Sequence, residues 1–277
     1  MTASSANTYP SLADKVAVVT GGGGVLCSSI AQALAAQKAR VAVLDLLPEA
    51  ADNVARNINT AGGKAIALKN NVLDKDDLQA ARDKVLSEFG RIDFLINGAG
   101  GNKKEASTSE TLSFFDLPTD ALKFVFELNI IGTILPCQVF GKTLAEKGTG
   151  GILNISSMSA FTPLTKIAAY SAAKAAVSNF TAWLAVHVCQ NYSTDIRVNA
   201  IAPGFFLTEQ NRFLLTDSDT GQLTPRGRTI IDHTPMGKFG QPEDLLGCVL
   251  WLLSDAASFV HGTVIPIDGG FNAFSGV

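Results

Sequence analysis

A tyrosine and a lysine stand four residues apart in the stretch Tyr170-Ser-Ala-Ala-Lys174. The surrounding pattern is helical, so this spacing places the phenol and the ammonium on one face of the helix. A tyrosine hydroxyl normally stays protonated up to about pH 10, but a fixed positive charge nearby favours the phenolate and lowers the pKa. The pair therefore predicts proton transfer, with Tyr170 as the acid or base and Lys174 as the source of charge.

Two further polar residues precede this pair. Ser157 ends the run Ile152-Leu-Asn-Ile-Ser-Ser157, which is predicted as a strand. Open α/β sheets bind ligands at the carboxyl ends of their strands, so Ser157 could hydrogen-bond a reacting oxygen. Asn129 lies in the otherwise apolar helical stretch Leu128-Asn-Ile-Ile-Gly132 and needs a buried partner or a bound water. A water held there could link Lys174 to solvent.

A glycine cluster follows the first apolar run, in Val16-Ala-Val-Val-Thr-Gly21-Gly-Gly-Gly24. A strand, a glycine turn and a helix in this order let backbone amides approach a pyrophosphate, although a turn without a ligand would look similar. Asp45 ends the second predicted strand, where its carboxylate would meet ribose hydroxyls and repel a 2′-phosphate. No Lys or Arg follows it closely. We therefore expect NAD (NADH) rather than NADP, and leave open that Asp45 only caps the next helix.

The rest of the chain supplies the elements that must position these residues. Short β-branched runs alternate with helical patterns, which is typical of a Rossmann-type, doubly wound α/β fold with a seven-stranded parallel sheet and helices on both faces. The predicted strands cover Val16–Thr20, Val41–Asp45, Ala65–Lys69, Phe94–Asn97, Ile152–Ser156, Arg197–Ile201 and Val264–Ile267. The predicted helices cover Ser28–Gln37, Glu49–Thr60, Lys75–Phe89, Ala121–Lys147, Ala168–Asn191 and Pro242–Leu253.

We expect the 277 residues to form one domain. Residues 1–14 are predicted to be an N-terminal arm, loose around Asn7 to Pro10. Residues 204–240 interrupt the regular alternation with prolines, glycines and charges, and a segment of this length in a compact domain is usually a lid or specificity element.

The composition of the chain limits the kinds of molecule that it is expected to bind. A formal net charge of -3 and a pI near 5.6 give no basic field for nucleic acid, so we expect a small-molecule substrate. The cysteines and histidines lack the spacing of a zinc site or a dense disulfide framework, so no metal is expected: Cys27, Cys137, Cys189, Cys248, His187, His233 and His261. The start lacks the features of a secretory signal, and no apolar run approaches membrane-spanning length. These features favour the cytoplasm and no membrane partner.

The chain resembles the short-chain dehydrogenase/reductase family in motifs that follow one another over nearly its whole length: Thr20-Gly21, Asn97-Gly-Ala-Gly100, Asn129, Ser157, Tyr170/Lys174 and Pro203-Gly204. The resemblance implies an oxidoreductase in which Tyr170 is the general acid or base and Ser157 polarises the carbonyl. It implies that Lys174 binds the nicotinamide ribose and lowers the tyrosine pKa, and that Asn129 holds a relay water.

The same resemblance implies cofactor contacts. Asn97 would position the cofactor beside the fourth strand, Thr208 would offer its hydroxyl to the nicotinamide amide, and Asn71 replaces the aspartate that usually faces the adenine amino group. Val25 and Cys27 replace two glycines of the family's turn, where their side chains could crowd the pyrophosphate. The expected NAD contacts are Gly21, Gly23, Gly24, Val25, Leu26, Asp45, Asn71, Val72, Asn97, Gly98, Ala99, Tyr170, Lys174, Pro203, Gly204, Phe206 and Thr208.

Within the family, Pro203-Gly-Phe-Phe-Leu-Thr-Glu-Gln-Asn-Arg212 and His233-Thr-Pro-Met-Gly237 resemble the D-mannonate oxidoreductase (fructuronate reductase) branch. This implies NAD-linked interconversion of D-mannonate and D-fructuronate in hexuronate breakdown. Arginine suits a sugar-acid carboxylate and amides suit its hydroxyls, but Arg212, Arg226 and Arg228 could equally be solvated lid charges. The expected substrate contacts are Asn102, Lys103, Ser157, Met158, Ser159, Tyr170, Asn211 and Arg212.

Two alternatives stay open. The catalytic residues serve many substrates, so a reductase for another polyol, ketone or sterol fits them equally. A non-catalytic nucleotide-binding sensor or scaffold would fit the altered glycine turn, but intact Ser157, Tyr170 and Lys174 argue against it. The apolar helical stretches 121–147 and 168–191 exceed what one sheet face needs, which predicts packing between subunits in a homotetramer, an assembly common in the family.

Overall fold

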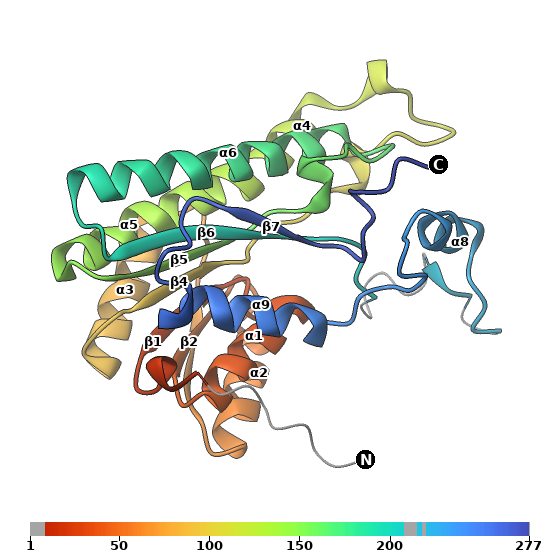
Figure 1. Ribbon diagram of the computed structural model, residues 1–277. Helices are drawn as coiled ribbons and strands as arrows, with labels where there is room; N and C mark the ends of the chain where they lie inside the picture. Colours follow the sequence, from red (N-terminus) through yellow and green to blue (C-terminus); the bar gives the residue numbers. More distant parts are fainter. Residues whose placement is uncertain (1–8, 208–214, 218–219, 277) are drawn as a thin grey trace, which may run out of the picture.

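The computed structural model describes residues 9–207, 215–217 and 220–276. In this part of the chain, seven parallel strands form one sheet with helices on both faces, which confirms the predicted doubly wound fold (Figure 1). The strands are β1 (Val16–Thr20), β2 (Arg40–Asp45), β3 (Lys64–Lys69), β4 (Phe94–Asn97), β5 (Gly150–Ile155), β6 (Ile196–Pro203) and β7 (Val264–Ile267). Each predicted strand boundary lies within two residues of the observed one.

The strand order is β3-β2-β1-β4-β5-β6-β7. From β1 in the middle of the sheet, the chain runs through β2 to the edge strand β3. It then crosses back so that β4 pairs with the other side of β1. The direction of winding therefore reverses between β1 and β4. Ligands of open α/β sheets bind outside the carboxyl ends of the strands at such a reversal.

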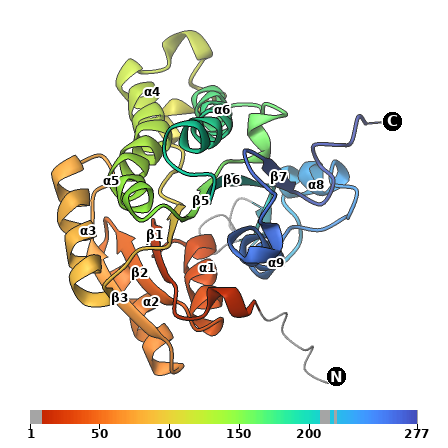
Figure 2. The same cartoon turned by 60° about the vertical axis from the view of Figure 1, so that its left-hand side comes forward.

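Helices cover the sheet in two layers, as Figures 1 and 2 show. One layer holds α1 (Val25–Ala36), α2 (Pro48–Thr60) and α9 (Glu243–Leu253), and the other holds α3 (Lys75–Phe89), α5 (Gly132–Lys147) and α6 (Ala168–Asn191). Side chains alternate along β1: Ala17 and Val19 face the first layer, whereas Val16 and Val18 face the second. All five β1 residues are buried, which explains why the strand reads as a continuous apolar run.

The helix predicted over residues 121–147 is interrupted. It comprises α4 (Thr119–Phe126), a π-helical turn, η4 (Glu127–Ile131), and then α5. Contrary to the sequence-based expectation, the combined stretch Thr119–Lys147 is long and apolar enough to cross a membrane by length and composition. In this fold its α5 part instead covers the sheet, with Phe140 and Leu144 fully buried against the strands.

The predicted N-terminal arm is partly packed. Tyr9 donates its backbone N–H to the Gln37 side chain at 2.8 Å, and a short 3₁₀ helix, η1 (Pro10–Leu12), buries Leu12 completely. Tyr9 and Pro10 therefore belong to the folded body, and the prediction of a loose stretch is wrong for them. The other short 3₁₀ helices are η2 (Lys104–Ala106), η3 (Phe114–Asp116), η5 (Met158–Ala160) and η6 (Asp255–Ala257).

The predicted lid segment, residues 204–240, contains a helix that sequence analysis missed, α8 (Pro225–Asp232). Thr224 caps it by accepting the Gly227 N–H at 3.0 Å, and Pro225 occupies its first turn, where proline is favourable. Leu215, Ile230 and Phe239 form a small core of their own. Figure 1 shows α8 to one side of the sheet, beyond the ends of β6 and β7.

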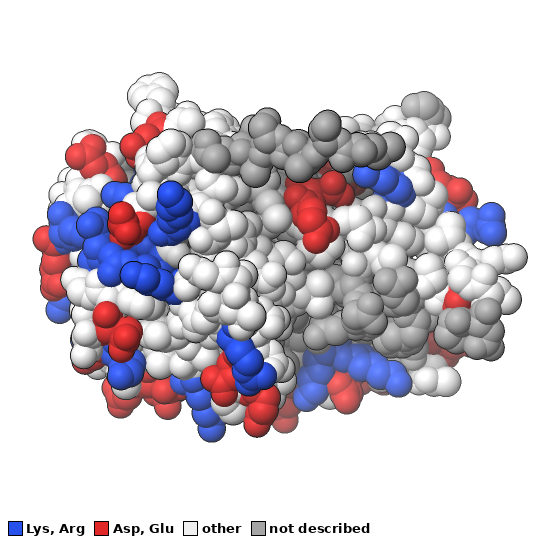
Figure 3. All heavy atoms as spheres, turned by 90° about the horizontal axis from the view of Figure 1, so that it is seen from below, with Lys and Arg blue, Asp and Glu red and all other residues white. Residues whose placement is uncertain are grey.

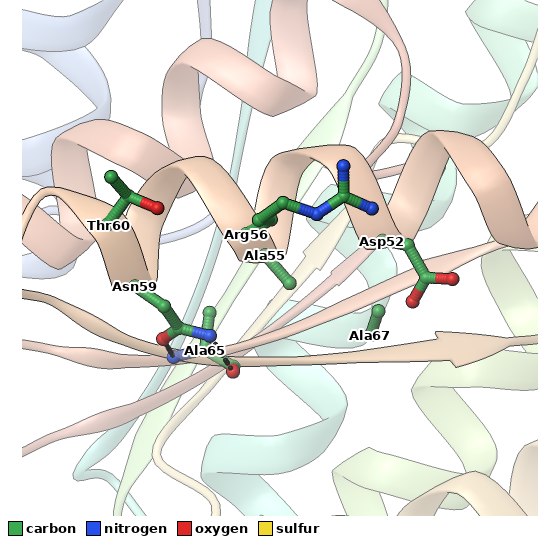
Figure 4. A pocket seen from close by; sticks show the side chains of 7 residues that line it. All are labelled: Asp52, Ala55, Arg56, Asn59, Thr60, Ala65 and Ala67. Carbon is green, nitrogen blue, oxygen red and sulfur yellow. Dashed lines mark hydrogen bonds between the residues drawn. The ribbon is translucent and has the colours of Figure 1, made fainter.

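The free edge of β3 is occupied by a side chain of α2. Asn59 donates its amide to the Ala65 carbonyl at 3.0 Å and accepts the Ala65 N–H at 2.8 Å, so its amide imitates a neighbouring strand (Figure 4). The shallow depression around this contact is bordered by Asp52 and Arg56. On the face seen in Figure 3, acidic side chains lie among the basic ones.

Candidate active site

Ser157, Tyr170 and Lys174 meet at the carboxyl end of β5. Ser157 lies two residues after the strand, whereas Tyr170 and Lys174 lie in the first two turns of α6. The Lys174 ammonium is buried, donates a 2.8 Å hydrogen bond to the Ile155 carbonyl, and lies 5.7 Å from the centre of the Tyr170 ring. The Ser157 hydroxyl accepts hydrogen bonds from the Ser159 N–H at 3.2 Å and the Ser159 hydroxyl at 3.1 Å, which fix its position.

Burial determines the protonation of both groups on α6. It raises the pKa of Tyr170 above its ordinary value, and the hydroxyl of Ser157 opposes this rise only in part. Burial also lowers the pKa of Lys174 to about 8. The expected lowering of the tyrosine pKa is therefore overturned, because removal of the hydroxyl from water outweighs the favourable groups around it. At neutral pH the arrangement holds a protonated phenol ready to donate.

Asn129 has the buried partners that its position requires. It lies in the π-helical turn η4, is fully buried, and donates to the carbonyls of Val125 and Gly101 at 2.7 Å each. Its carbonyl oxygen accepts the Gly101 N–H at 3.1 Å. A Cβ at Gly100 would lie 2.8 Å from Asn129 Oδ1 and 3.1 Å from Lys174 Nζ, so Gly100 separates the two side chains. Rare π-helical turns often mark functional sites.

The glycine turn packs closely between β2 and the loop after β4. Gly21 has a φ of +60°, and a Cβ there would lie 2.8 Å from the backbone of Ala99. The Gly23 N–H donates to Asp45 Oδ2 at 3.0 Å, while Asp45 Oδ1 accepts the Leu47 N–H at the entry to α2. Asp45 therefore binds the backbone N–H at the start of α2, which is close to the helix-capping role that the sequence left as an alternative. It also lies against the glycine turn. Among the described residues, no side chain caps α1 at Gly24, so its first-turn amides have no side-chain acceptor there.

Cys27 is buried against the loop after β4. Its sulfur lies against Gly98, where any Cβ would collide with it, and the Thr20 carbonyl would be only 2.8 Å from that Cβ. Burial raises the pKa of the Cys27 thiol to about 12, so the group is neutral. The glycine at position 98 thus accommodates the cysteine, while Val25 remains partly exposed at the start of α1.

The loop after β4 is held by residues on three strands. The Thr20 hydroxyl accepts the N–H groups of Gly98 and Ala99 at 3.2 and 3.3 Å, a role that sequence analysis did not assign. The buried Asn97 side chain donates to Asn154 Oδ1 at 2.8 Å and to the Cys137 sulfur at 3.1 Å. Its amide nitrogen thus connects β4 with β5 and α5, and its Oδ1 is buried without a partner among the described residues, so a cofactor contact by Asn97 would fall to its backbone.

The end of β3 holds a residue that sequence analysis missed. Asn71 is exposed, and its Oδ1 accepts the Leu73 N–H at 3.0 Å, whereas Val72 is buried against Gly132. The preceding residue, Asn70, is also buried, and neither atom of its side-chain amide has a partner among the described residues. In the sequence, the position of Asn70 beside Asn71 at the end of a strand could have indicated a site residue.

The expected substrate residues are scattered around the opening. Asn102 is exposed and donates to the Ser107 hydroxyl at 2.8 Å, and Lys103 Nζ lies 5.2 Å from the Phe124 ring centre. Met158 and Ser159 are each 1% exposed and point into the protein. Thr208, Asn211 and Arg212 lie outside the described residues.

The lid segment begins at the end of β6. Pro203 is the last residue of β6. A Cβ at the next residue, Gly204, would lie 2.6 Å from Asp268, so glycine permits the chain after β7 to approach closely. Phe206 is buried and lies against Gly240 at the other end of the segment. The two ends of the predicted lid are therefore brought together beside the sheet.

Comparison with known proteins now decides the family. The family model described as enoyl-(acyl carrier protein) reductase matches residues 25–272. An uncharacterized oxidoreductase of Haemophilus influenzae is 51% identical over 277 residues, covering 96% of each chain. The chain belongs to the short-chain dehydrogenase/reductase family. It is accordingly an oxidoreductase of the kind that acts on CH–OH groups.

Two further relatives bear on the chemistry. A crystal structure of a Haemophilus protein with bound NAD, provisionally named a D-mannonate oxidoreductase, is 50% identical, with a TM-score of 0.90 over 96% of this chain and 98% of that one. The 7alpha-hydroxysteroid dehydrogenase of Escherichia coli is 31% identical over 256 residues, covering 92% of this chain and 93% of the relative. The predicted nicotinamide cofactor agrees with the NAD in the first of these short-chain dehydrogenase/reductase relatives.

Proposed function

We propose that this protein is an NAD-dependent sugar-acid oxidoreductase that interconverts D-fructuronate and D-mannonate. One observation carries the oxidoreductase mechanism: a half-buried tyrosine beside Ser157 and Lys174, at the sheet edge to which the glycine turn also belongs. Similarity to the provisionally named D-mannonate oxidoreductase supports the substrate.

In the proposed reaction, Tyr170 donates its proton to the carbonyl oxygen of the keto acid, and removes it again in the reverse direction. Its raised pKa suits the reductive direction at neutral pH, because the acid form is the populated one. Ser157 hydrogen-bonds the same oxygen and orients it. Lys174 would hold the ribose next to the nicotinamide, and Asn129 would hold a water that connects Lys174 to solvent.

The residues of the turn fit a dinucleotide. Uncapped amides at the start of α1 suit a pyrophosphate, and Asp45 suits the adenosine ribose while repelling a 2′-phosphate, which favours NAD over NADP. When bound, the nicotinamide supplies or accepts the hydride. Besides Tyr170 and Lys174, the proposed contacts are those expected from the sequence: Gly21, Gly23, Gly24, Val25, Leu26, Asp45, Asn71, Val72, Asn97, Gly98, Ala99, Pro203, Gly204, Phe206 and Thr208. Asn97 would contribute through its backbone, because its side chain is buried.

For the substrate we retain Asn102 and Lys103 as candidates for the far end of the sugar acid, with Asn211 and Arg212 from the lid segment. Lys103 could leave its place over Phe124 to meet a carboxylate. Met158 and Ser159 would contribute only through their backbone, because their side chains are buried.

The test is direct. Purified protein is mixed with NADH and D-fructuronate, and NADH consumption is followed against a panel of other keto acids, simple ketones, polyols and a 7-oxo steroid. Consumption with fructuronate and not with the steroid is the expected result. Turnover of the panel without any hexuronate would leave the oxidoreductase mechanism standing and overturn the substrate, whereas a marked preference for NADPH would overturn the role of Asp45.

We also propose a homotetramer in the cytoplasm. Apolar side chains are exposed on the outer face of α6 and at its end, including Trp183 at 56%, Val186 at 56% and Tyr192 at 60%. Trp183 and Tyr192 border a groove of about 870 Å³ between α5 and α6, and exposed apolar surface of this kind often marks a contact with another subunit. The cysteines are all free, which suits a reducing compartment. Light scattering after size exclusion tests the assembly, and a monomeric mass would contradict it.

A further inference from the structure

The residues after β7 form a defined turn. In this C-terminal turn, residues 268–274, the Asp268 carboxylate accepts the N–H groups of Gly270 and Asn272 at 2.9 Å each. The Ala273 and Phe274 N–H groups both donate to the Gly270 carbonyl at 3.1 Å. Gly269 and Gly270 take positive φ values of +65° and +89°, which side chains rarely adopt. The segment is thus a built element with a fixed relation to β7.

The C-terminal turn is bound to the loop that carries the catalytic serine. The Thr162 hydroxyl donates a 2.6 Å hydrogen bond to Asn272 Oδ1, across 110 residues of sequence. Thr162 belongs to the catalytic loop, residues 156–167, which joins β5 to α6. Its N–H also donates to the Met158 carbonyl at 3.1 Å, one residue after Ser157. A displacement of Asn272 would therefore reach the backbone beside the serine through two hydrogen bonds.

The same turn also contacts two of the described parts of the lid segment, residues 204–207 and 220–240. The Phe271 ring meets Phe205 edge to face at 5.2 Å between centroids, and His233 lies 6.5 Å from the rings of Phe271 and Phe274. The Met236 N–H donates to the Gly269 carbonyl at 3.1 Å. The lid segment and the catalytic loop are thus held by one short element between them.

We infer that the C-terminal turn couples the lid segment to the catalytic loop, with Asn272 acting as a positioning residue for Ser157 through Thr162. The inference rests on the proposed function, in which the lid segment contributes contacts to the far end of the sugar acid. Displacements of about 1 Å at reacting groups cost large factors in rate, so a contact that fixes the catalytic loop relative to the lid segment bears on turnover. Because the lid segment is linked to the catalytic loop, substrate hydroxyls that contact the lid segment can influence the oxygen held by Ser157.

The coupling can be measured without any substrate. Thr162→Val removes the donor at nearly constant volume, Thr162→Ser keeps it, and Thr165→Val is a matched control at an exposed threonine in the same loop. Hydrogen exchange of the full protein is followed by mass spectrometry. We expect Thr162→Val to speed exchange about threefold to tenfold in peptides of the catalytic loop, the C-terminal turn and residues 229–237, as for loss of one hydrogen bond. Peptides of β4 should not change.

A second experiment reads the consequence for the reaction. Thr162→Val and Asn272→Ala should each lower kcat/KM for the best substrate about threefold to tenfold, and the double variant should be no worse than either single one. Thr162→Ser should retain the parental value, and the Kd of NADH should not change. Faster exchange confined to the catalytic loop, or additive kinetic losses, would overturn the coupling. If hexuronates are not substrates, the exchange result still decides the inference.

Discussion

The Lys174 ammonium lies 5.7 Å from the centre of the Tyr170 ring and is directed to the Ile155 carbonyl at the end of β5. This places the lysine beneath the tyrosine, where it joins α6 to the sheet. Burial governs both groups: it raises the pKa of Tyr170 and lowers that of Lys174 to about 8. The pair is therefore better described as a protonated acid and a positioned cation than as a preformed phenolate.

The first prediction concerns the pH dependence of turnover. A raised pKa keeps the Tyr170 hydroxyl protonated beyond its ordinary range, so kcat for reduction should stay level through neutral and mildly alkaline pH. Oxidation requires the phenolate, so its kcat should rise with pH over the same range. Tyr170→Phe should lower kcat about 100-fold to 10,000-fold in both directions with little change in NADH binding. Tyr192→Phe, at an exposed position, is the control, and equal losses in both variants would refute the assignment.

The second prediction concerns stability and Lys174. Its pKa falls from 10.5 to about 8 on folding, so between these pH values the unfolded chain binds more protons than the native protein. Stability therefore rises with pH through this window, relative to a variant without the group. Urea unfolding of Lys174→Met should show its largest gain over the parent below pH 8 and a smaller one near pH 10.5. Lys84→Met, at an exposed lysine, should show no such trend.

The third prediction tests the accommodation of Cys27. A methyl group at Gly98 would collide with the Cys27 sulfur and approach the Thr20 carbonyl to 2.8 Å, so the loop after β4 must shift. Gly98→Ala should weaken NADH binding at least tenfold, because this loop packs on the glycine turn, a loss equivalent to about 1.4 kcal/mol. Gly101→Ala is the matched control, since a Cβ there meets nothing within 4 Å. Fluorescence titration with NADH separates the two, and equal affinities would contradict this reading.

Much of this architecture was predictable because its signals are local. Continuous apolar runs such as β1 mark strands buried on both faces, and helical spacing alone brings Tyr170 and Lys174 to one face of α6. Ser157 was placed correctly because the carboxyl ends of parallel strands share one edge.

What sequence reasoning missed depends on contacts between distant segments. Nothing near Cys27 indicates that Gly98 makes room for its sulfur, and nothing near Thr162 indicates that its hydroxyl donates a hydrogen bond to Asn272, 110 residues away. The raised pKa of Tyr170 follows from burial, which helical spacing does not report. The helix α8 had a local signal, Thr224 followed by Pro225, but the surrounding glycines and charges obscured it.

The last prediction concerns a buried carboxylate at the opposite end of the sheet from the active site. Asp93 precedes β4, is 2% exposed, and accepts from Arg91 and Lys147 at 2.6 Å each and from the Val16 N–H at 2.9 Å. These donors outweigh the cost of burial, so the pKa of Asp93 is lowered from 3.8. Asp93→Ala leaves these donors without their acceptor and should cost about 3 kcal/mol in the free energy of unfolding near neutral pH. Because a lowered pKa gives stability that is lost as pH falls below the unfolded value, the difference from the parent should shrink only below about pH 4. Asp83→Ala, which breaks only the exposed ion pair with Arg82, should cost under about 1 kcal/mol in the same urea titrations. Equal losses of unfolding free energy in Asp93→Ala and Asp83→Ala would contradict the stabilising role of the buried carboxylate.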